Sequence, residues 1–315
     1  MLPTSLATSL QTAADLAISK VLANGGKHTC RPSGEVSAVR AITLDGFDEV
    51  AVHWSPILSS LGYSIDLKAV FCHSRPHVTF QPVPHPKYQG GMTPRRCELA
   101  DMLIVIDHVD PIRKIDDRRA VLVQAKLLKG GRVKPSGKEW IQHELLGWLP
   151  KFTFVDTSYD QRTRDFKGKP LVGSPAHTAE YGGIDLNVSS PVWQQEMVQK
   201  TPPWFGLPIP LSGFLAFMAT GNMNCSRHAI HGGRDDWSFT VDELLRITAT
   251  RPITKKKSIQ LRGNHNVVGF LADTSQLFGS GGGGDYIEGD VPEWPEGPIS
   301  TVHMTFRSID SRAEK

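Results

Sequence analysis

The segments CELADMLIVID (residues 97–107) and RRAVLVQAK (residues 118–126) are the part of the sequence that says most about the fold. Each contains a short run of aliphatic residues, which is typical of a buried β-strand. They predict two neighbouring strands near residues 99–106 and 119–126. Polar residues stand at the ends of these runs: Glu98 and Asp101 at the start of the first, Gln124 and Lys126 at the end of the second.

An antiparallel hairpin would bring these polar ends together, because the start of its first strand lies beside the end of its second. The two-residue period of a strand places Gln124 and Lys126 on the same side. Carboxylate and amide oxygens are the ligands that Mg²⁺ prefers, and an ammonium group can stabilise negative charge on a phosphoryl oxygen. The pattern predicts a Mg²⁺ (or Mn²⁺) site suited to phosphodiester hydrolysis.

Asp101 and the QAK segment (residues 124–126), with 23 positions from Asp101 to Gln124, resemble the PD-(D/E)XK (restriction-endonuclease-like) nuclease superfamily. The likeness is greatest to its Mrr-like branch, in which glutamine replaces an acidic residue, and it covers residues 45–150. It implies an α/β fold with a mixed central β-sheet flanked by helices. It also implies Mg²⁺-dependent cleavage of DNA and a role as effector of a bacterial restriction or anti-phage defence system.

The resemblance assigns a role to each matching position. Asp101 would be the metal-binding aspartate, Gln124 the second ligand and Lys126 the catalytic lysine. Many members add an acidic residue from the helix before the sheet, for which Glu49 is the candidate, and Glu98 is an alternative ligand. Ala100 stands where proline gives the motif its name, and Gln124 makes the site less acidic than the glutamate form.

Basic residues are concentrated around the second predicted strand. Between residues 113 and 138 there are nine lysines and arginines and two aspartates, whereas the whole chain carries a net charge of +3. Such a segment suits a polyanion, although a solvated, lysine-rich loop is the alternative. The residues expected to contact DNA phosphates, in a salt-sensitive way, are Arg113, Arg118, Arg119, Lys129 and Arg132.

The remaining patterns predict the elements around this hairpin. We expect helices at residues 5–24, 46–61 (kinked or divided at Pro56), 138–148 and 240–249, the last with a capping box of Thr240 and Glu243. Strands are expected at residues 63–73, 255–263 and 299–309, with loops at 74–96 and 279–285. Residues 1–150 would form the helical lead-in and the nuclease core. Residues 151–315 would form a C-terminal α+β extension that completes or decorates the core and offers a partner-binding surface.

Two other functional classes stay open. Two groups of soft ligands, Cys72 with His73 and His77 and Cys225 with His228 and His231, would suit a zinc hydrolase, although neither has a CxxC pair. The chain could instead be a non-catalytic DNA-binding or scaffold subunit that keeps the nuclease fold. The partners expected for the nuclease or for the scaffold subunit are DNA, a second copy of the chain, and an ATPase or sensor subunit.

Composition sets the expected compartment. The sequence contains no run of 18 apolar residues and no basic, apolar leader at its start, so we expect no membrane association and a cytoplasmic protein. The four cysteines form no disulfide pattern and are expected to be reduced.

Overall fold

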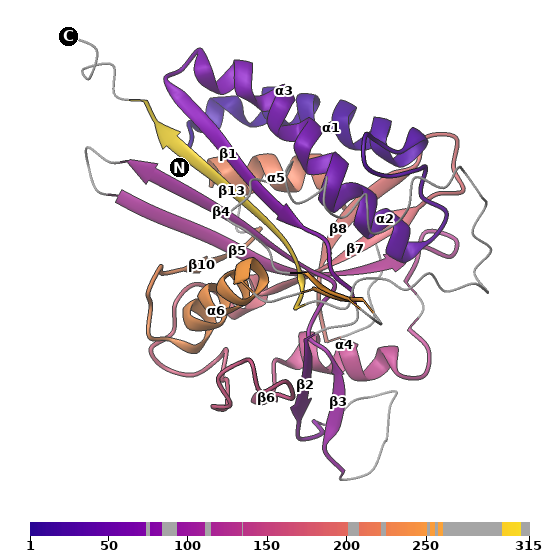
Figure 1. Ribbon diagram of the computed structural model, residues 1–315, viewed down its shortest axis with the longest axis vertical. Coiled ribbons are helices and arrows are strands. Elements are labelled where there is room, and N and C mark those ends of the chain that lie inside the picture. Colours follow the sequence, from indigo (N-terminus) through magenta and orange to yellow (C-terminus); the bar gives the residue numbers. More distant parts are fainter. Residues whose placement is uncertain are drawn as a thin grey trace.

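The structure is a computed structural model and describes residues 1–73, 76–83, 93–110, 115–133, 135–200, 208–221, 225–250, 253–255, 258–260 and 298–309. Its centre is an eight-stranded mixed sheet in the order β1-β13-β4-β5-β7-β8-β9, and β10 also pairs with β5. Helices lie on both sides of this sheet (Figure 1). The predicted α/β class, with a mixed sheet flanked by helices, is confirmed.

Besides the central sheet, the strands form two smaller sheets, β3-β2-β6 and β11-β12. The strands are β1 (Tyr63–Val70), β2 (His77–Phe80), β3 (Arg95–Glu98), β4 (Met102–Asp110), β5 (Ile115–Leu127), β6 (Phe152–Phe154), β7 (Ala179–Asp185), β8 (Val192–Met197), β9 (Ile209–Pro210), β10 (Arg227–Ala229), β11 (Ile253–Lys255), β12 (Ser258–Gln260) and β13 (Ser300–Ser308).

The helices include one π-helical turn, which joins α2 to α3 in a continuous helical segment. They are η1 (Thr4–Leu6), α1 (Ala7–Asn24), α2 (Glu35–Ala41), the π-helix η2 (Ile42–Gly46), α3 (Phe47–Ser59), α4 (Glu139–Trp148), η3 (Pro175–His177), α5 (Leu211–Thr220) and α6 (Asp236–Thr250).

The predicted hairpin is present as β4 and β5, which pair antiparallel from Met102 opposite Val123 onward. β7 follows parallel to β5 after α4, and β13 lies between β1 and β4, antiparallel to the first and parallel to the second. Strands from before and after residue 150 therefore share one sheet, with β13 inserted between β1 and β4. The side-by-side position of β1, β13, β4 and β5 is visible in Figure 1.

Successive residues of β4 serve two separate cores, because side chains of a strand point alternately to its two faces. Met102 and Ile104 pack with α1, α3 and α5. Leu103 and Val105 pack in the core that includes α6 and the small sheet β3-β2-β6. A hairpin buried on both faces explains why its sequence is almost continuously apolar.

Two expected features differ in the structure. The segment 74–96 was expected to be loop, but His77–Phe80 forms β2, which pairs with both β3 and β6 and so gains partners on both edges. Helix α6 begins at Asp236, and Asp235 caps it by accepting a hydrogen bond from the Ser238 N–H (3.0 Å). The capping box at Thr240 was therefore wrong, because a better capping residue stands one turn earlier.

Pro56 lies inside α3 without ending it. A proline removes the hydrogen bond to the carbonyl four residues earlier, which here belongs to Val52. Val52 lies on the exposed side of the helix (61% exposed), where water can satisfy that carbonyl. The helix therefore continues to Ser59, close to the end predicted from the apolar pattern.

Candidate active site

Asp101 and Gln124 meet at one end of the β4–β5 hairpin. Asp101 directly precedes β4, and its N–H donates to the carbonyl of Val123 (3.1 Å), which continues the ladder by one residue. The Oδ2 atom of Asp101 accepts hydrogen bonds from the Ala125 N–H (2.8 Å) and from the side-chain amide of Gln124. Both side chains lie in phase with Leu103, on the face of the sheet covered by α4 and α6.

Lys126 follows two residues later on the same face. Its ammonium group contacts Glu35 Oε1 (2.9 Å) and Glu139 Oε1 (3.3 Å), and only 14% of its side chain is exposed. Burial alone would lower its pKa, but Asp101 and Glu35 raise the pKa above its usual range. Lys126 is therefore a fixed cation at neutral pH and cannot serve as a general base. We name these five residues, Asp101, Gln124, Lys126, Glu35 and Glu139, the Asp101 cluster.

Burial is the main reason that the pKa of Asp101 lies well above its ordinary value. The charge of Lys126 lowers it, whereas the carboxylates of Glu98 and Glu35 raise it. Asp101, Glu35 and Glu139 are three carboxyl groups around this one cation. The cluster thus carries more negative charge than its own cation neutralises. A buried carboxylate in this state favours the approach of a further positive charge.

Gln124 supplies a second sign of an incomplete site. The residue is 2% exposed, and its amide nitrogen donates to Asp101, whereas its Oε1 atom has no hydrogen-bond partner among the described residues. A buried acceptor without a partner costs roughly 1–3 kcal/mol. An incoming cation or donor at this oxygen would remove that cost.

Glu35 occupies the place that the sequence analysis gave to an acidic residue on the helix before the sheet. It is the first residue of α2, and its Oε2 atom also accepts from the Leu127 N–H (3.3 Å). The sequence held a signal for it: Gly34, Glu35 and Ser37 form a helix start, with the Ser37 hydroxyl accepting from the Gly34 N–H (2.9 Å). The helices predicted from the apolar pattern do not include this one.

Glu49 does not join the cluster. It lies on α3, where its carboxylate pairs with Lys20 of α1 (2.9 Å) and with His53 (3.6 Å). The apolar stripe of α3 that faces the core contains Val50 and Trp54, so Glu49 is turned toward the surface between α1 and α3. The structure corrects this assignment in favour of Glu35.

Glu98 ends β3, close enough to Asp101 to raise its pKa. Its backbone carbonyl accepts from the side chain of Gln142 on α4 (3.4 Å), so Gln142 is a buried contact between α4 and β3. His73 follows β1 and is close enough to Lys126 to be affected by its charge. Burial, together with that charge, lowers the pKa of His73.

The fit of Mg²⁺ to these residues is limited to a small donor set. Within the described ranges, no three histidine, cysteine, aspartate or glutamate side chains form a group that could hold a metal ion. Asp101 and the Oε1 atom of Gln124 offer two hard oxygen ligands. Mg²⁺ commonly takes one or two protein ligands and completes its shell with water and substrate phosphate, so this donor set fits a weakly held cation.

The basic residues predicted to bind DNA divide between two places. Lys129 and Arg132 are exposed in the turn that follows β5, near the Asp101 cluster. Arg119 pairs with Asp117 (3.7 Å) at the opposite end of β5. Arg118 is buried and bound to Asp107, which corrects its assignment to phosphate binding. Arg113 lies outside the described residues.

The two proposed zinc groups do not assemble among the described residues. Cys225 is buried in the core with α1 and α5, whereas His228 pairs with Asp117 (3.2 Å) and His231 with Asp242 (3.1 Å). In the first group, His77 pairs in β2 opposite Glu98, and Cys72 is buried beside Ser300. The loop predicted at residues 279–285 falls outside the described part.

No helix in the described part of the chain meets the length and apolarity needed to cross a bilayer. Comparison with known proteins finds no matching family model, no matching curated protein and no matching solved structure. The function has to be inferred from the residues at the end of the β4–β5 hairpin.

Proposed function

We propose that this chain is a metal-dependent nuclease that hydrolyses DNA phosphodiester bonds at the Asp101 cluster. The observation that carries this proposal is the meeting of Asp101, Gln124 and Lys126 on one face of two paired strands. The same three residues carry the resemblance to the PD-(D/E)XK superfamily. A role as effector of a bacterial restriction or anti-phage system is part of this proposal.

Asp101 and Gln124 Oε1 would hold the Mg²⁺ or Mn²⁺ ion. When bound, that ion supplies Lewis acidity toward the phosphoryl group. The excess carboxylate charge around Asp101 and the unpartnered amide oxygen support this assignment. Because the pKa of Asp101 is raised, protons compete for its carboxylate, and cation binding is expected to weaken as pH falls.

Lys126 would act on the phosphate itself. In hydrolysis, a water oxygen forms a bond to phosphorus, the bond from phosphorus to one sugar oxygen breaks, and one proton passes from the water to the departing oxygen. Negative charge grows on the phosphoryl oxygens in the transition state. The Lys126 ammonium, which stays protonated, would donate a hydrogen bond to one of them.

Glu35 and Glu139 would position Lys126. Each contacts the ammonium group from a different helix, so the lysine is restrained from two directions. Glu139 is ionised for this task, because burial is outweighed by the Ser136 N–H and Lys126, and its pKa is lowered. Lys129 and Arg132, exposed beyond Lys126, would hold the phosphates of the DNA backbone.

Purified full-length protein should be incubated with supercoiled plasmid and with linear duplex in Mg²⁺ and in Mn²⁺. We expect wild type to cleave, and Asp101→Asn and Lys126→Met to lose roughly a hundredfold or more of the rate. Glu49→Gln is the matched control, because it removes a lysine-paired carboxylate outside the cluster. Binding of Mn²⁺ measured by electron paramagnetic resonance gives a second readout, and we expect Asp101→Asn to weaken it.

A non-catalytic DNA-binding or scaffold subunit is the second candidate. It is supported by the small donor set: Asp101 is the one carboxylate hydrogen-bonded to Gln124, and no group of three candidate ligands exists among the described residues. DNA binding in a gel-shift assay, without cleavage in either metal, would establish this alternative. Cleavage that survives Asp101→Asn and Lys126→Met would refute the proposed active site.

A further inference from the structure

A pocket of about 320 Å³ lies between β1 and β13 of the sheet and α6. Lys68 and His303 reach it from the two strands, and Arg246 from the helix. Arg118 of β5 also lines it and binds Asp107 of β4. Asp107 and Arg118 lie six residues along the hairpin from Asp101 and Gln124, or about 20 Å. The pocket is therefore separate from the Asp101 cluster, although both lie on the same face of the sheet.

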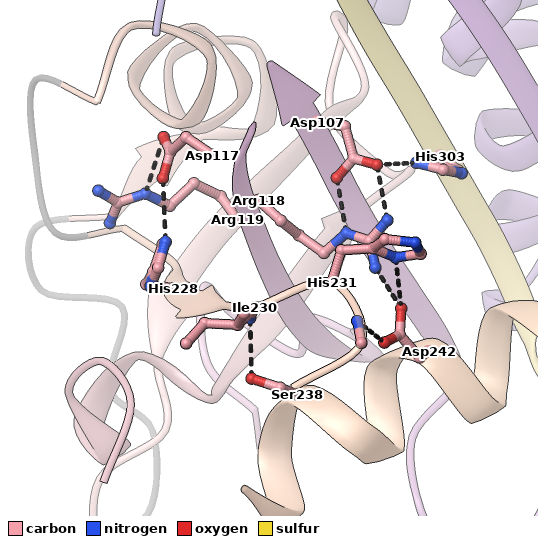
Figure 2. Close-up of polar contacts among 11 residues, drawn as sticks. Asp107, Asp117, Arg118, Arg119, His228, Ile230, His231, Ser238, Asp242 and His303 are labelled. Carbon is pink, nitrogen blue, oxygen red and sulfur yellow. Dashed lines mark hydrogen bonds and ion pairs between the residues drawn. The ribbon is translucent and has the colours of Figure 1, made fainter. Parts of the chain in front are cut away.

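The back of the pocket is built from fixed charges, which Figure 2 shows in close-up. Arg118 donates to both oxygens of Asp107 (2.7 Å each) and also contacts Asp242 of α6. His303 binds Asp107 Oδ2 through its Nε2 atom (2.8 Å). We name these four residues, Asp107, Arg118, Asp242 and His303, the Asp107 cluster; they tie three strands and one helix together.

The mouth of the pocket is cationic. Lys68 is exposed on β1, opposite His303 in the strand register. Arg246 has a side chain that is 64% exposed, and its contact to Glu243 is long (3.8 Å). His231 stands beside Asp242 (3.1 Å), with a side chain that is 66% exposed. These groups lie at the surface, where an anion can reach them.

The pocket also has an apolar side, formed by Val70 of β1 and by Leu245 and Ala249 of α6. Its volume falls at the lower end of the range of small-molecule sites, about 300–1,000 Å³. A bare inorganic anion would leave this apolar surface uncovered. A ligand that fills the pocket would combine a charged group with a compact, uncharged body.

We propose that this pocket binds a small phosphorylated ligand of about mononucleotide size. Its phosphate contacts Lys68 and Arg246, with His231 beside them, and its body covers Val70, Leu245 and Ala249. Arg118 does not bind the phosphate directly, because Asp107 and Asp242 already occupy its guanidinium. Its role is to keep the wall of the pocket rigid. This binding site does not depend on nuclease activity at the Asp101 cluster.

The test is isothermal titration calorimetry of the full-length protein with AMP, CMP and ribose 5-phosphate. Adenosine, which lacks the phosphate, and inorganic phosphate, which lacks the uncharged body, are titrated for comparison. We expect at least one of the three phosphorylated compounds to bind with a dissociation constant of about 1 mM or tighter. Adenosine and inorganic phosphate should each bind at least about tenfold more weakly. The double variant Lys68→Ala/Arg246→Ala should weaken the binding by tenfold or more.

The matched control is Lys20→Ala/Lys151→Ala, which removes two exposed cations from other surfaces (60% and 69% exposed). This control has the same net charge as the pocket variant. If both variants bound the phosphorylated compounds equally weakly, the attraction of these compounds would be nonspecific and the proposal would be overturned. Failure of all three phosphorylated compounds to bind would also overturn it. Equal affinity for inorganic phosphate would exclude the role of the apolar wall, and equal affinity for adenosine would exclude the role of the cations.

Discussion

The two ends of the β4–β5 hairpin hold a half-buried carboxylate, Asp101, and a buried one, Asp107, in opposite electrostatic states. At one end, Asp101 receives hydrogen bonds from an amide and a backbone N–H, and burial together with neighbouring acids raises its pKa. At the other end, burial of Asp107 is outweighed by hydrogen bonds from Arg118 and His303, and its pKa lies well below the usual range. The same hairpin thus has at one end a carboxylate whose charge is neutralised by a bound guanidinium, and at the other a carboxylate without such a partner.

The difference shows where to look for function when side-chain geometry is the guide. A guanidinium that donates twice to a carboxylate satisfies both of its oxygens and fixes it as part of the framework. A carboxylate buried without such a partner keeps its demand for a cation. By this reasoning the Asp107 cluster stabilises the fold and shapes a pocket wall, whereas the Asp101 cluster is suited to hold a metal ion.

The largest expected effect concerns stability. Asp107→Asn should lower the free energy of unfolding by about 3 kcal/mol, because it leaves the buried Arg118 without its main counter-charge. Asp101→Asn should change it by no more than about 1 kcal/mol. Urea denaturation at pH 7 measures both. Equal losses in the two variants would contradict the distinction between the clusters, and cleavage per folded molecule should be kept in Asp107→Asn.

A smaller effect separates the two helix carboxylates. Glu35→Gln should slow DNA cleavage about tenfold, or about 1.4 kcal/mol, because Lys126 loses its nearest charged partner. Glu49→Gln, which loosens an ion pair of the same length to Lys20, should leave the rate unchanged. Both variants should unfold at similar temperatures. Slower cleavage in Glu49→Gln than in Glu35→Gln would reverse the assignment made from the structure.

The smallest effect is a difference in pH dependence. Because folding lowers the pKa of Asp107, its stabilisation is complete above the unfolded value near 3.9 and is lost as pH falls through the folded value. Folding raises the pKa of Asp101, so its charge costs stability as pH rises from about 3.9 through the raised value.

Urea titrations between pH 7 and pH 3 test this difference. The difference in unfolding free energy between wild type and Asp107→Asn should become smaller toward pH 3. The unfolding free energy of Asp101→Asn should instead rise relative to that of wild type toward pH 7, by about 1 kcal/mol. If the difference in unfolding free energy between variant and wild type changed with pH in the same direction for both variants, the pKa values of the two carboxylates would not be shifted in opposite directions.

How much of the site could be read from the sequence depends on distance along the chain. Asp101, Gln124 and Lys126 were predicted because two adjacent strands with a two-residue period fix which side chains meet. Glu35 stands far from them in sequence, and the folding of α2 against the end of β5 is what brings it to Lys126. An acidic residue on a preceding helix was expected. The helix start at Gly34 indicates that Glu35 is helical, but no local pattern shows that Glu35, rather than Glu49, reaches Lys126.

The basic segment shows the same limit. Its net positive charge suggested one surface for a polyanion, yet residues near its start lie about 20 Å from residues near its end when β5 is extended. Arg118 turned out to be neutralised by Asp107 on the neighbouring strand and by Asp242 on α6. Charge counted along a sequence cannot reveal a counter-charge that comes from a distant element.

The sequence by itself determined the mixed α/β class, the β4–β5 hairpin and the meeting of three polar residues at its end, because strand periodicity and adjacent pairing are local properties. Only the tertiary structure decided that β13 enters the sheet beside β4, that Glu35 and Glu139 restrain Lys126, and that α6 closes a pocket against β1 and β13. Those features join residues far apart in the chain, and packing of the two cores selects them.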